Sequence, residues 1–211
     1  FALRELDVIP PVETRHVESA DAAVLAAAEM GGSVALKAIG PDLVHKSDLG
    51  AVALGLSGAT DLGRAGAAIK ESLATAGVAH DGWLVQEMAG EGHEVIFGIS
   101  TDPRFGPLLM FGLGGKYVEV FQDVRFGVTP LSAAEAGDMI RGIRGFALLE
   151  GVRGDAAVDL AALEETLLRL AQLAVRHPRI QELDINPFIA APARETCKAV
   201  DVRVRVGDVS D

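Results

Sequence analysis

The sequence is poor in cysteine and in basic residues. A single cysteine among 211 residues, Cys197, excludes an internal disulfide and any site built from several thiolates. It favours a reducing compartment, so we expect a cytoplasmic protein. Lys and Arg number 19 against 30 Asp and Glu, a net charge of −11. That balance argues against a nucleic-acid partner, which needs a basic face, and any anionic ligand must be held locally.

The sequence also lacks a signal-peptide pattern and any apolar run that approaches membrane-spanning length. We therefore expect no membrane partner. Apolar residues make up 49% of the chain, which is ample for a core, and 211 residues fit one large domain or two lobes. The chain begins with Phe1 instead of methionine, so we expect it to be a fragment of something longer.

Apolar periodicity predicts a first group of elements in residues 1–89. A helix is expected between Ser19, which caps it, and Gly31, which ends it. The other expected elements are a connector at 1–17, strands at 34–39, 51–56 and 83–88, and a helix at 61–76. The glycine-rich residues 89–92 suit a hinge, so we place the end of an N-terminal lobe at residue 89.

The same patterns predict a second lobe at residues 90–206, followed by a tail at 207–211. The expected elements are strands at 93–100, 107–113 and 117–121, helices at 132–143 and 159–177, and a closing hairpin of 180–190 and 197–206. The leucines of the long helix repeat at helical spacing, so we interpret that helix as core.

One stretch, residues 34–48, combines a strand with a charged loop. Lys37 lies in the middle of an apolar run, Gly40 and Pro41 break the run, and His45 follows in the loop. This pattern is typical of a strand that leads into a functional loop. The alternative is that Lys37 is a solvated edge-strand residue and that His45 is merely exposed.

The closing hairpin carries a second group of polar residues. Period-two alternation puts Glu182, Asp184 and Asn186 on one face of its first strand. If the hairpin loop is symmetric, Asn186 faces Asp201 in the second strand. An amide oxygen opposite a carboxylate suits a hard cation such as Mg²⁺, which takes few protein ligands. The alternative is an ordinary polar outer face on a half-buried hairpin.

The segment 111–119 is rich in glycine, and Gly114 and Gly115 would let backbone amides approach a phosphate group. Alone, such a segment is most often a tight turn between strands. It is not a P-loop, which needs glycine where Met110 stands and serine or threonine where Tyr117 stands. The sequence also lacks a complete nucleophile-elbow pattern and histidines at zinc-ligand spacing, so we exclude serine hydrolases and zinc enzymes.

Together these motifs resemble the ATP-grasp half of the NDP-forming acyl-CoA synthetases and, more distantly, the succinyl-CoA synthetase β chain. The motifs follow one another in family order over residues 1–206: VALK, PDLVHKSD, VQEMAGEGHEVIFG, DPRFGPLLMFGLGGKYVEVFQDVRFGVTPL, GVRG, ELDINP and AVDVRV. One departure is Leu49 before Gly50, where the family commonly has paired glycines. The resemblance implies an α+β, ATP-grasp fold in which two lobes close on a nucleotide.

The resemblance also implies roles for individual residues. Lys37 corresponds to the strand lysine that touches the ATP phosphates, and His45 to the loop histidine proposed to carry a phosphoryl group between the two halves of the enzyme. Asn186 and Asp201 correspond to the magnesium ligands. The remaining positions are Gln86, Glu87 and Met88 beside adenine and ribose, Glu94 and Glu119 near the nucleotide, Gly114 and Gly115 in the glycine-rich loop, and Arg125 as a phosphate-facing cation.

By this resemblance, the chain binds ATP or ADP with Mg²⁺ and transfers a phosphoryl group between the nucleotide and a phosphohistidine during acyl-CoA formation or cleavage. Its partner would be a CoA-binding half, either a separate subunit or another part of the same longer chain. One alternative is a nucleotide-sensing regulatory domain fused to an acetyltransferase domain. A plain interaction domain is a third, and it explains none of the residues above.

Overall fold

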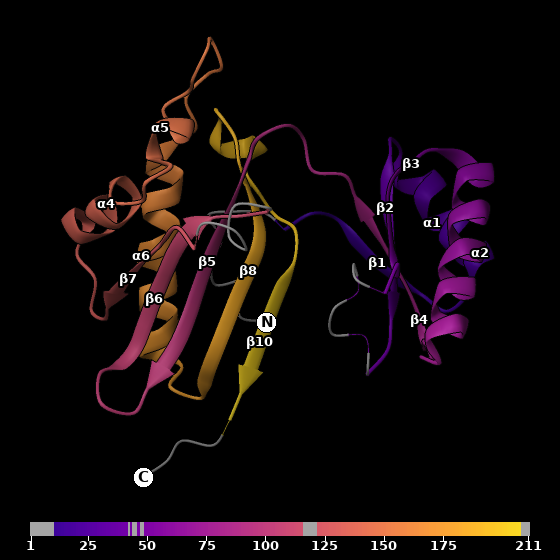
Figure 1. Cartoon of the computed structure of the whole chain (residues 1–211), viewed down its shortest axis with the longest axis horizontal. Coiled ribbons are helices and arrows are strands. Elements are labelled where there is room, and N and C mark those ends of the chain that lie inside the picture. Colours follow the sequence, from indigo (N-terminus) through magenta and orange to yellow (C-terminus); the bar gives the residue numbers. More distant parts are fainter. Residues whose placement is uncertain (1–10, 42, 44–45, 47–48, 116–121, 208–211) are drawn as a thin grey trace. The chain divides into compact units, whose positions relative to one another are not determined.

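The computed structural model describes residues 11–41, 43, 46, 49–115 and 122–207 (Figure 1). The chain forms two compact units. The first unit runs from Val12 to Met88, and the second unit contains the other described residues. Our division into functional lobes at 1–89 and 90–206 stays a prediction.

The first unit is a four-stranded antiparallel sheet with two helices on one face (Figure 1). Its strands, in the order β1-β4-β2-β3, are β1 (Thr14–Val17), β4 (Gly82–Glu87), β2 (Val34–Ile39) and β3 (Val52–Leu56). The helices are α1 (Ala20–Met30) and α2 (Gly58–Ala76). Their apolar sides pack on Leu36, Trp83 and Val85 of the sheet and form one core.

Local sequence signals set the ends of these helices. Ser19 accepts a hydrogen bond from the Ala22 backbone N–H at 3.1 Å, which satisfies a free donor in the first turn of α1. Gly77 has φ +68° and ends α2 in the left-handed conformation that glycine adopts readily. The predicted start of α1 at Ser19 and the predicted end of α2 at Ala76 are both confirmed, although α2 begins at Gly58, earlier than expected.

The expected connector at 1–17 is partly wrong, because Thr14–Val17 form β1 and pair with β4. The strand has four residues, and Val17 is its only aliphatic residue. Such a short, polar strand has no apolar alternation of its own. β1 forms because its backbone pairs with the edge strand β4, and that contact joins residues far apart in the sequence.

The second unit is a six-stranded sheet covered on one face by helices (Figure 1). Its main strands, in the order β10-β8-β5-β6-β7, are β10 (Val202–Val206), β8 (Ile180–Ala190), β5 (His93–Asp102), β6 (Gly106–Leu113) and β7 (Val124–Val128). The short β9 (Lys198–Ala199) pairs with β8. The helices are α4 (Ala133–Arg141), α5 (Phe146–Leu149), α6 (Leu160–Arg176) and the 3-10 turn η2 (Arg194–Thr196).

Apolar side chains from alternate strand positions fill the space under these helices. Phe97 lies at the centre, with ring centroids 5.2 Å from Phe111 and 5.1 Å from Phe188. The predicted role of α6 as core is confirmed, because Leu163, Leu167 and five other apolar residues of this helix are buried. Among the residues that the structure describes, no helix covers the other face of the sheet. Within the part of the chain that the structure describes, no helix is long and apolar enough to cross a membrane.

Most expected elements of the second unit are present; the two long helices are slightly shorter than expected, and β5 and β6 are slightly longer. Ser132 and Glu135 form a capping box, which starts α4 where the sequence placed a helix. β7 was not expected, since Arg125 interrupts its apolar pattern. The strand expected at 117–121 lies outside the described residues.

Candidate functional site

Lys37 lies in the middle of β2, on the helix-free face of the first unit's sheet. Its neighbours Leu36 and Ala38 belong to the core beneath the helices, so alternation turns Lys37 the opposite way. The side chain is only 7% exposed, and β2 is an inner strand between β4 and β3. The alternative of a solvated edge-strand lysine is therefore wrong.

Gln86 lies on the same face, in the adjacent strand β4. It pairs with Ala35, two positions along β2 from Lys37. Gln86 is also 7% exposed, and its Nε2 donates a hydrogen bond to Thr14 Oγ1 at 3.0 Å. The fold thus brings an amide and an ammonium group, far apart in the sequence, to one helix-free face.

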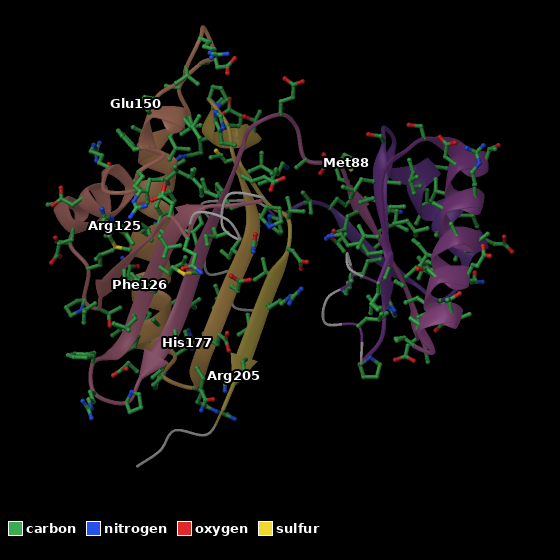
Figure 2. All side chains as sticks on the ribbon, viewed as in Figure 1. Met88, Arg125, Phe126, Glu150, His177 and Arg205 are labelled. Carbon is green, nitrogen blue, oxygen red and sulfur yellow. The ribbon has the colours of Figure 1, made fainter. Side chains whose placement is uncertain are left out.

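Glu87 and Met88 follow at the end of β4, where Figure 2 labels Met88. The Glu87 backbone N–H donates to the Glu13 carbonyl at 2.9 Å, and that of Met88 to the Ser33 carbonyl at 3.2 Å. The Glu87 side chain is exposed. Both backbone donors are therefore used within the first unit, and the exposed Glu87 carboxylate, when ionised, is a hydrogen-bond acceptor.

The second unit holds the predicted hairpin in the predicted register. Asp184 pairs with Arg203, and two positions further along β8 the Asn186 backbone N–H donates to the Asp201 carbonyl at 2.9 Å. Asn186 and Asp201 therefore lie opposite each other, as the symmetric loop required. The register is confirmed, and the magnesium role of the two residues stays a prediction.

The expected single strand at 197–206 is interrupted between β9 and β10. The break lies opposite Pro187, which has no N–H to donate to the ladder. The Val200 N–H donates to the Pro187 carbonyl at 3.1 Å, and β8 also shifts its register against β5 near this point. Such irregularities re-aim side chains, and here Asn186 is exposed on the helix-free face.

Asp184 belongs to the same face, and the sequence analysis gave it no role. Burial raises the pKa of the Asp184 carboxyl above its ordinary value, and Arg203 counters part of that rise. The negative charges of Asp201 and Glu182 raise the pKa further. Alternation in the sequence already placed Asp184 on this face. Its partial burial and its closeness to other carboxylates could be seen only in the folded structure.

The residues on this face fit a hard cation. Asn186 supplies an amide oxygen and Asp201 a carboxylate, and Mg²⁺ takes such oxygen ligands together with water and phosphate oxygens. A cation would also relieve the repulsion that acts on Asp184. Among the described residues, no three His, Cys, Asp or Glu side chains gather as a metal site. A site here would therefore need ligands from the substrate or from water.

Glu94 and the paired glycines lie together at one end of the six-stranded sheet. The Gly114 N–H donates to the Glu94 carbonyl at 2.7 Å. A Cβ atom on Gly114 would lie 2.9 Å from the Glu94 backbone, and one on Gly115, whose φ is +59°, would collide with the Glu94 carboxylate. Glycine is needed at both positions, so the structure brings these three predicted residues into contact.

Arg125 lies apart from the candidate metal ligands. It pairs with Phe111, a core residue, which puts it on the helix-covered face of the sheet. Its Nε donates to the Gly142 carbonyl at 2.6 Å. Figure 2 shows Arg125 beside β7, whereas the labelled Arg205 marks β10 at the other edge. The expected phosphate-facing role is therefore at odds with this placement, because Asn186 and Asp201 lie on the opposite face.

Two further predicted residues, His45 and Glu119, lie outside the described residues. Their roles rest on the sequence motifs. Described residues flank both, Leu43 and Lys46 around His45, and Gly115 and Gln122 around the segment that contains Glu119.

The chain matches the ATP-grasp domain family over residues 3–206. The β subunit of ADP-forming acetate–CoA ligase I from Pyrococcus furiosus is 35% identical over 198 residues, which cover 93% of this chain and 84% of the subunit. ADP-forming acetate–CoA ligase I from Archaeoglobus fulgidus is 41% identical over 163 residues, 76% of this chain but 24% of that protein. The chain thus spans most of the first relative and about a quarter of the second.

Solved structures show the same likeness. Acetyl-coenzyme A synthetase 1 of Ca. Korarchaeum cryptofilum, in complex with coenzyme A, Ca-AMPCP and HgCl⁺, has a TM-score of 0.90 and 38% identity, over 97% of this chain and 89% of that chain. The same protein with coenzyme A and Mg-AMPPCP has its phosphohistidine segment pointing towards the nucleotide binding site. That structure has a TM-score of 0.79 and 39% identity, over 94% of this chain and 86% of that chain.

Proposed function

Since this chain belongs to the ATP-grasp family of the ADP-forming acyl-CoA synthetases, we propose that it is the part of such an enzyme that binds ATP or ADP with Mg²⁺. The family match and the TM-score of 0.90 confirm the predicted α+β ATP-grasp fold. The proposed reaction moves a phosphoryl group between the nucleotide and His45 during acyl-CoA formation or cleavage. The CoA-binding half would be another subunit or another part of a longer chain, in keeping with the 24% coverage of the A. fulgidus relative.

The observation that carries this proposal is the register of the β8–β10 hairpin. It sets Asn186 opposite Asp201 on a helix-free face, and the related synthetase has been solved with Mg-AMPPCP. An amide and a carboxylate leave most of the coordination shell of Mg²⁺ to phosphate oxygens and water. That sharing suits a cation that arrives with a nucleotide.

The chain's own residues account for the chemistry as follows. ATP gives its γ-phosphoryl group to an imidazole nitrogen of His45 and ADP leaves, and the reverse step restores ATP and the free imidazole. A neutral imidazole nitrogen carries the lone pair that accepts the phosphoryl group. Lys37 offsets the negative charge of the phosphates, and Asn186 and Asp201 would hold Mg²⁺, which neutralises phosphate charge when bound.

Nucleotide binding and labelling test the proposal. In calorimetric titration the chain should bind Mg-ADP and Mg-ATP weakly, and chelation of Mg²⁺ by EDTA should reduce the affinity. Radiolabelled ATP should label the wild type and not His45→Ala, with analysis at alkaline pH because phosphohistidine is acid-labile. A folded protein that binds no nucleotide at millimolar concentration contradicts the proposal.

The regulatory alternative makes a different prediction for the same variant. In a sensor fused to an acetyltransferase domain, His45→Ala would leave the activity of that domain unchanged as long as nucleotide still bound. The relatives described above carry names of ligases and synthetases, which favours catalysis. The sequence of the full-length gene separates the two, since it would carry either a CoA-binding half or an acetyltransferase domain.

A further inference from the structure

Gln86 has a hydrogen-bond partner on β1, a strand that the sequence patterns did not predict. The two strands pair Gln86 with Thr14, and Gln86 Nε2 donates to Thr14 Oγ1 at 3.0 Å. Thr14 Oγ1 in turn donates to the carbonyl of Val12 at 3.0 Å, and Val12 is buried. Two hydrogen bonds in series therefore connect the Gln86 amide, through the Thr14 hydroxyl, to the backbone of a buried residue.

The second of these bonds decides the direction of the first. A threonine hydroxyl has one hydrogen to donate, and at Thr14 that hydrogen goes to the Val12 carbonyl. Toward Gln86 the hydroxyl oxygen can then only accept, so it selects the NH₂ end of the amide. Thr14 thereby sets which end of the Gln86 amide lies against β1.

Packing alone does not set this orientation. The oxygen and the NH₂ group of a glutamine amide are so alike in size that their hydrogen bonds tell them apart. Gln86 is buried, but burial would hold the amide equally well with either end against β1. The difference matters to a ligand, since Oε1 accepts hydrogen bonds and the NH₂ group donates them.

We propose that Thr14 is a positioning residue that orients Gln86 for the nucleoside part of the nucleotide, an inference that rests on the proposed function. With Nε2 held at Thr14, the geometry of the amide puts the acceptor Oε1 on the side away from Thr14. A nucleoside has donors that suit this acceptor, in its ribose hydroxyls and base amino group, whereas ionised phosphate oxygens only accept. On the same face, the ammonium group of Lys37 only donates, which suits the phosphates.

A purely structural role of Thr14 predicts something else. The hydroxyl would then only tie the edge strand β1 to β4, and its loss would lower the melting temperature. The affinity of the folded protein would stay the same, or it would fall equally for ligands with and without a nucleoside. The two roles therefore separate in ligand affinity measured beside melting temperature.

The test measures ligand binding by the full chain in calorimetric titration. Thr14→Val removes the hydroxyl but keeps the shape of the side chain, and it should weaken Mg-ADP binding about three- to tenfold. Binding of Mg-pyrophosphate, which has no nucleoside, should stay within about twofold of wild type. Thr14→Ser keeps the hydroxyl and should bind Mg-ADP like the wild type. Thr14→Ala repeats the test if Thr14→Val does not fold.

A double-mutant cycle shows whether Thr14 acts through Gln86. In a Gln86→Ala background, Thr14→Val should have no further effect on Mg-ADP affinity. His16→Ala is the matched control, because His16 lies on the same strand and the same face as Thr14 but pairs with Leu84. This control should bind Mg-ADP like the wild type.

Two analogues identify the donor of the nucleoside. The loss of affinity in Thr14→Val should vanish with 2′,3′-dideoxy-ADP if a ribose hydroxyl is the donor, and with IDP, which has no amino group on its base, if the base is. A loss that persists with both analogues, wild-type Mg-ADP affinity in Thr14→Val, or an equal loss in His16→Ala overturns the inference and leaves the proposed function intact. A folded wild type that binds no Mg-ADP contradicts the proposed function itself.

Discussion

The two units differ in what their buried polar residues do. In the first unit, the candidate ligands Lys37 and Gln86 are each 7% exposed. In the second unit, the candidate ligand Asn186 is exposed, and the buried polar residues Asp123 and Thr166 instead bond to nearby backbone groups. The buried polar residues of the first unit are therefore candidate ligands, whereas those of the second unit hold backbone structure in place.

The difference teaches how to interpret a buried polar side chain. Asp123 accepts backbone N–H groups, so its burial is explained by the turn that it holds. Lys37 is buried on the helix-free face beside Gln86, at the position of the lysine that touches the ATP phosphates in the family motif. Its place in that motif, and not its burial alone, makes it a candidate ligand.

Asp123→Ala should give the largest effect, and it should be on stability alone. The two Asp123 oxygens each accept a backbone N–H at 2.7 Å, from Arg144 and Gly145. Leaving both donors unpaired should lower the free energy of unfolding by about 2–5 kcal/mol, measured by urea denaturation. Asp123→Asn keeps one acceptor and should lose less. A loss below about 1 kcal/mol for Asp123→Ala would show that water replaces the carboxylate.

Lys37→Met should give the next largest effect, this time on function. Methionine keeps the length and apolar stem of the side chain, so melting should change little. Loss of the charge that offsets the phosphates should slow labelling of His45 about 100-fold and weaken Mg-ADP binding. If the variant is labelled at the normal rate, Lys37 does not take part in phosphoryl transfer. If the variant does not fold, the role of Lys37 is structural.

Asn186→Ala and Asp201→Ala should give smaller and matching effects. Each removes one oxygen ligand, so Mg²⁺-dependent nucleotide affinity should fall about tenfold, while affinity in EDTA stays the same. Melting should stay close to wild type because Asn186 is exposed. If the melting temperature collapses instead, the polar face serves only to hold the hairpin together.

Asp184→Asn should give the smallest effect. Burial raises the pKa of the Asp184 carboxyl above its ordinary 3.8, so the folded state keeps this proton to higher pH than the unfolded state does. The stability that this proton confers is complete below about pH 4 and is lost as pH rises through the raised pKa. The variant, which cannot ionise, should melt a few degrees higher at pH 7, and this gain should vanish below about pH 4. If the melting temperature rises by the same amount at every pH, the gain comes from better packing and not from the lost charge.

Several features were predictable because their causes are local. Ser19 and the Ser132–Glu135 pair start helices through hydrogen bonds within one turn. The pairing of Asn186 with Asp201 followed from alternation and loop symmetry, since a slip by one residue would turn the apolar residues of β8 outward. β1 could not be predicted, because its four residues pair only where β4 offers an edge.

The sequence by itself determined most of the elements, the hairpin register and the candidate residues, because caps, alternation and motifs act over a few residues. The tertiary structure alone decided which face of each sheet the helices cover and how deeply each residue is buried. It placed Lys37 and Gln86 together on a helix-free face and put the exposed Arg125 on the helix-covered face of the other sheet, at the end of α4. Faces and burial depend on which strands pair and where helices pack, and those contacts join residues distant in the sequence.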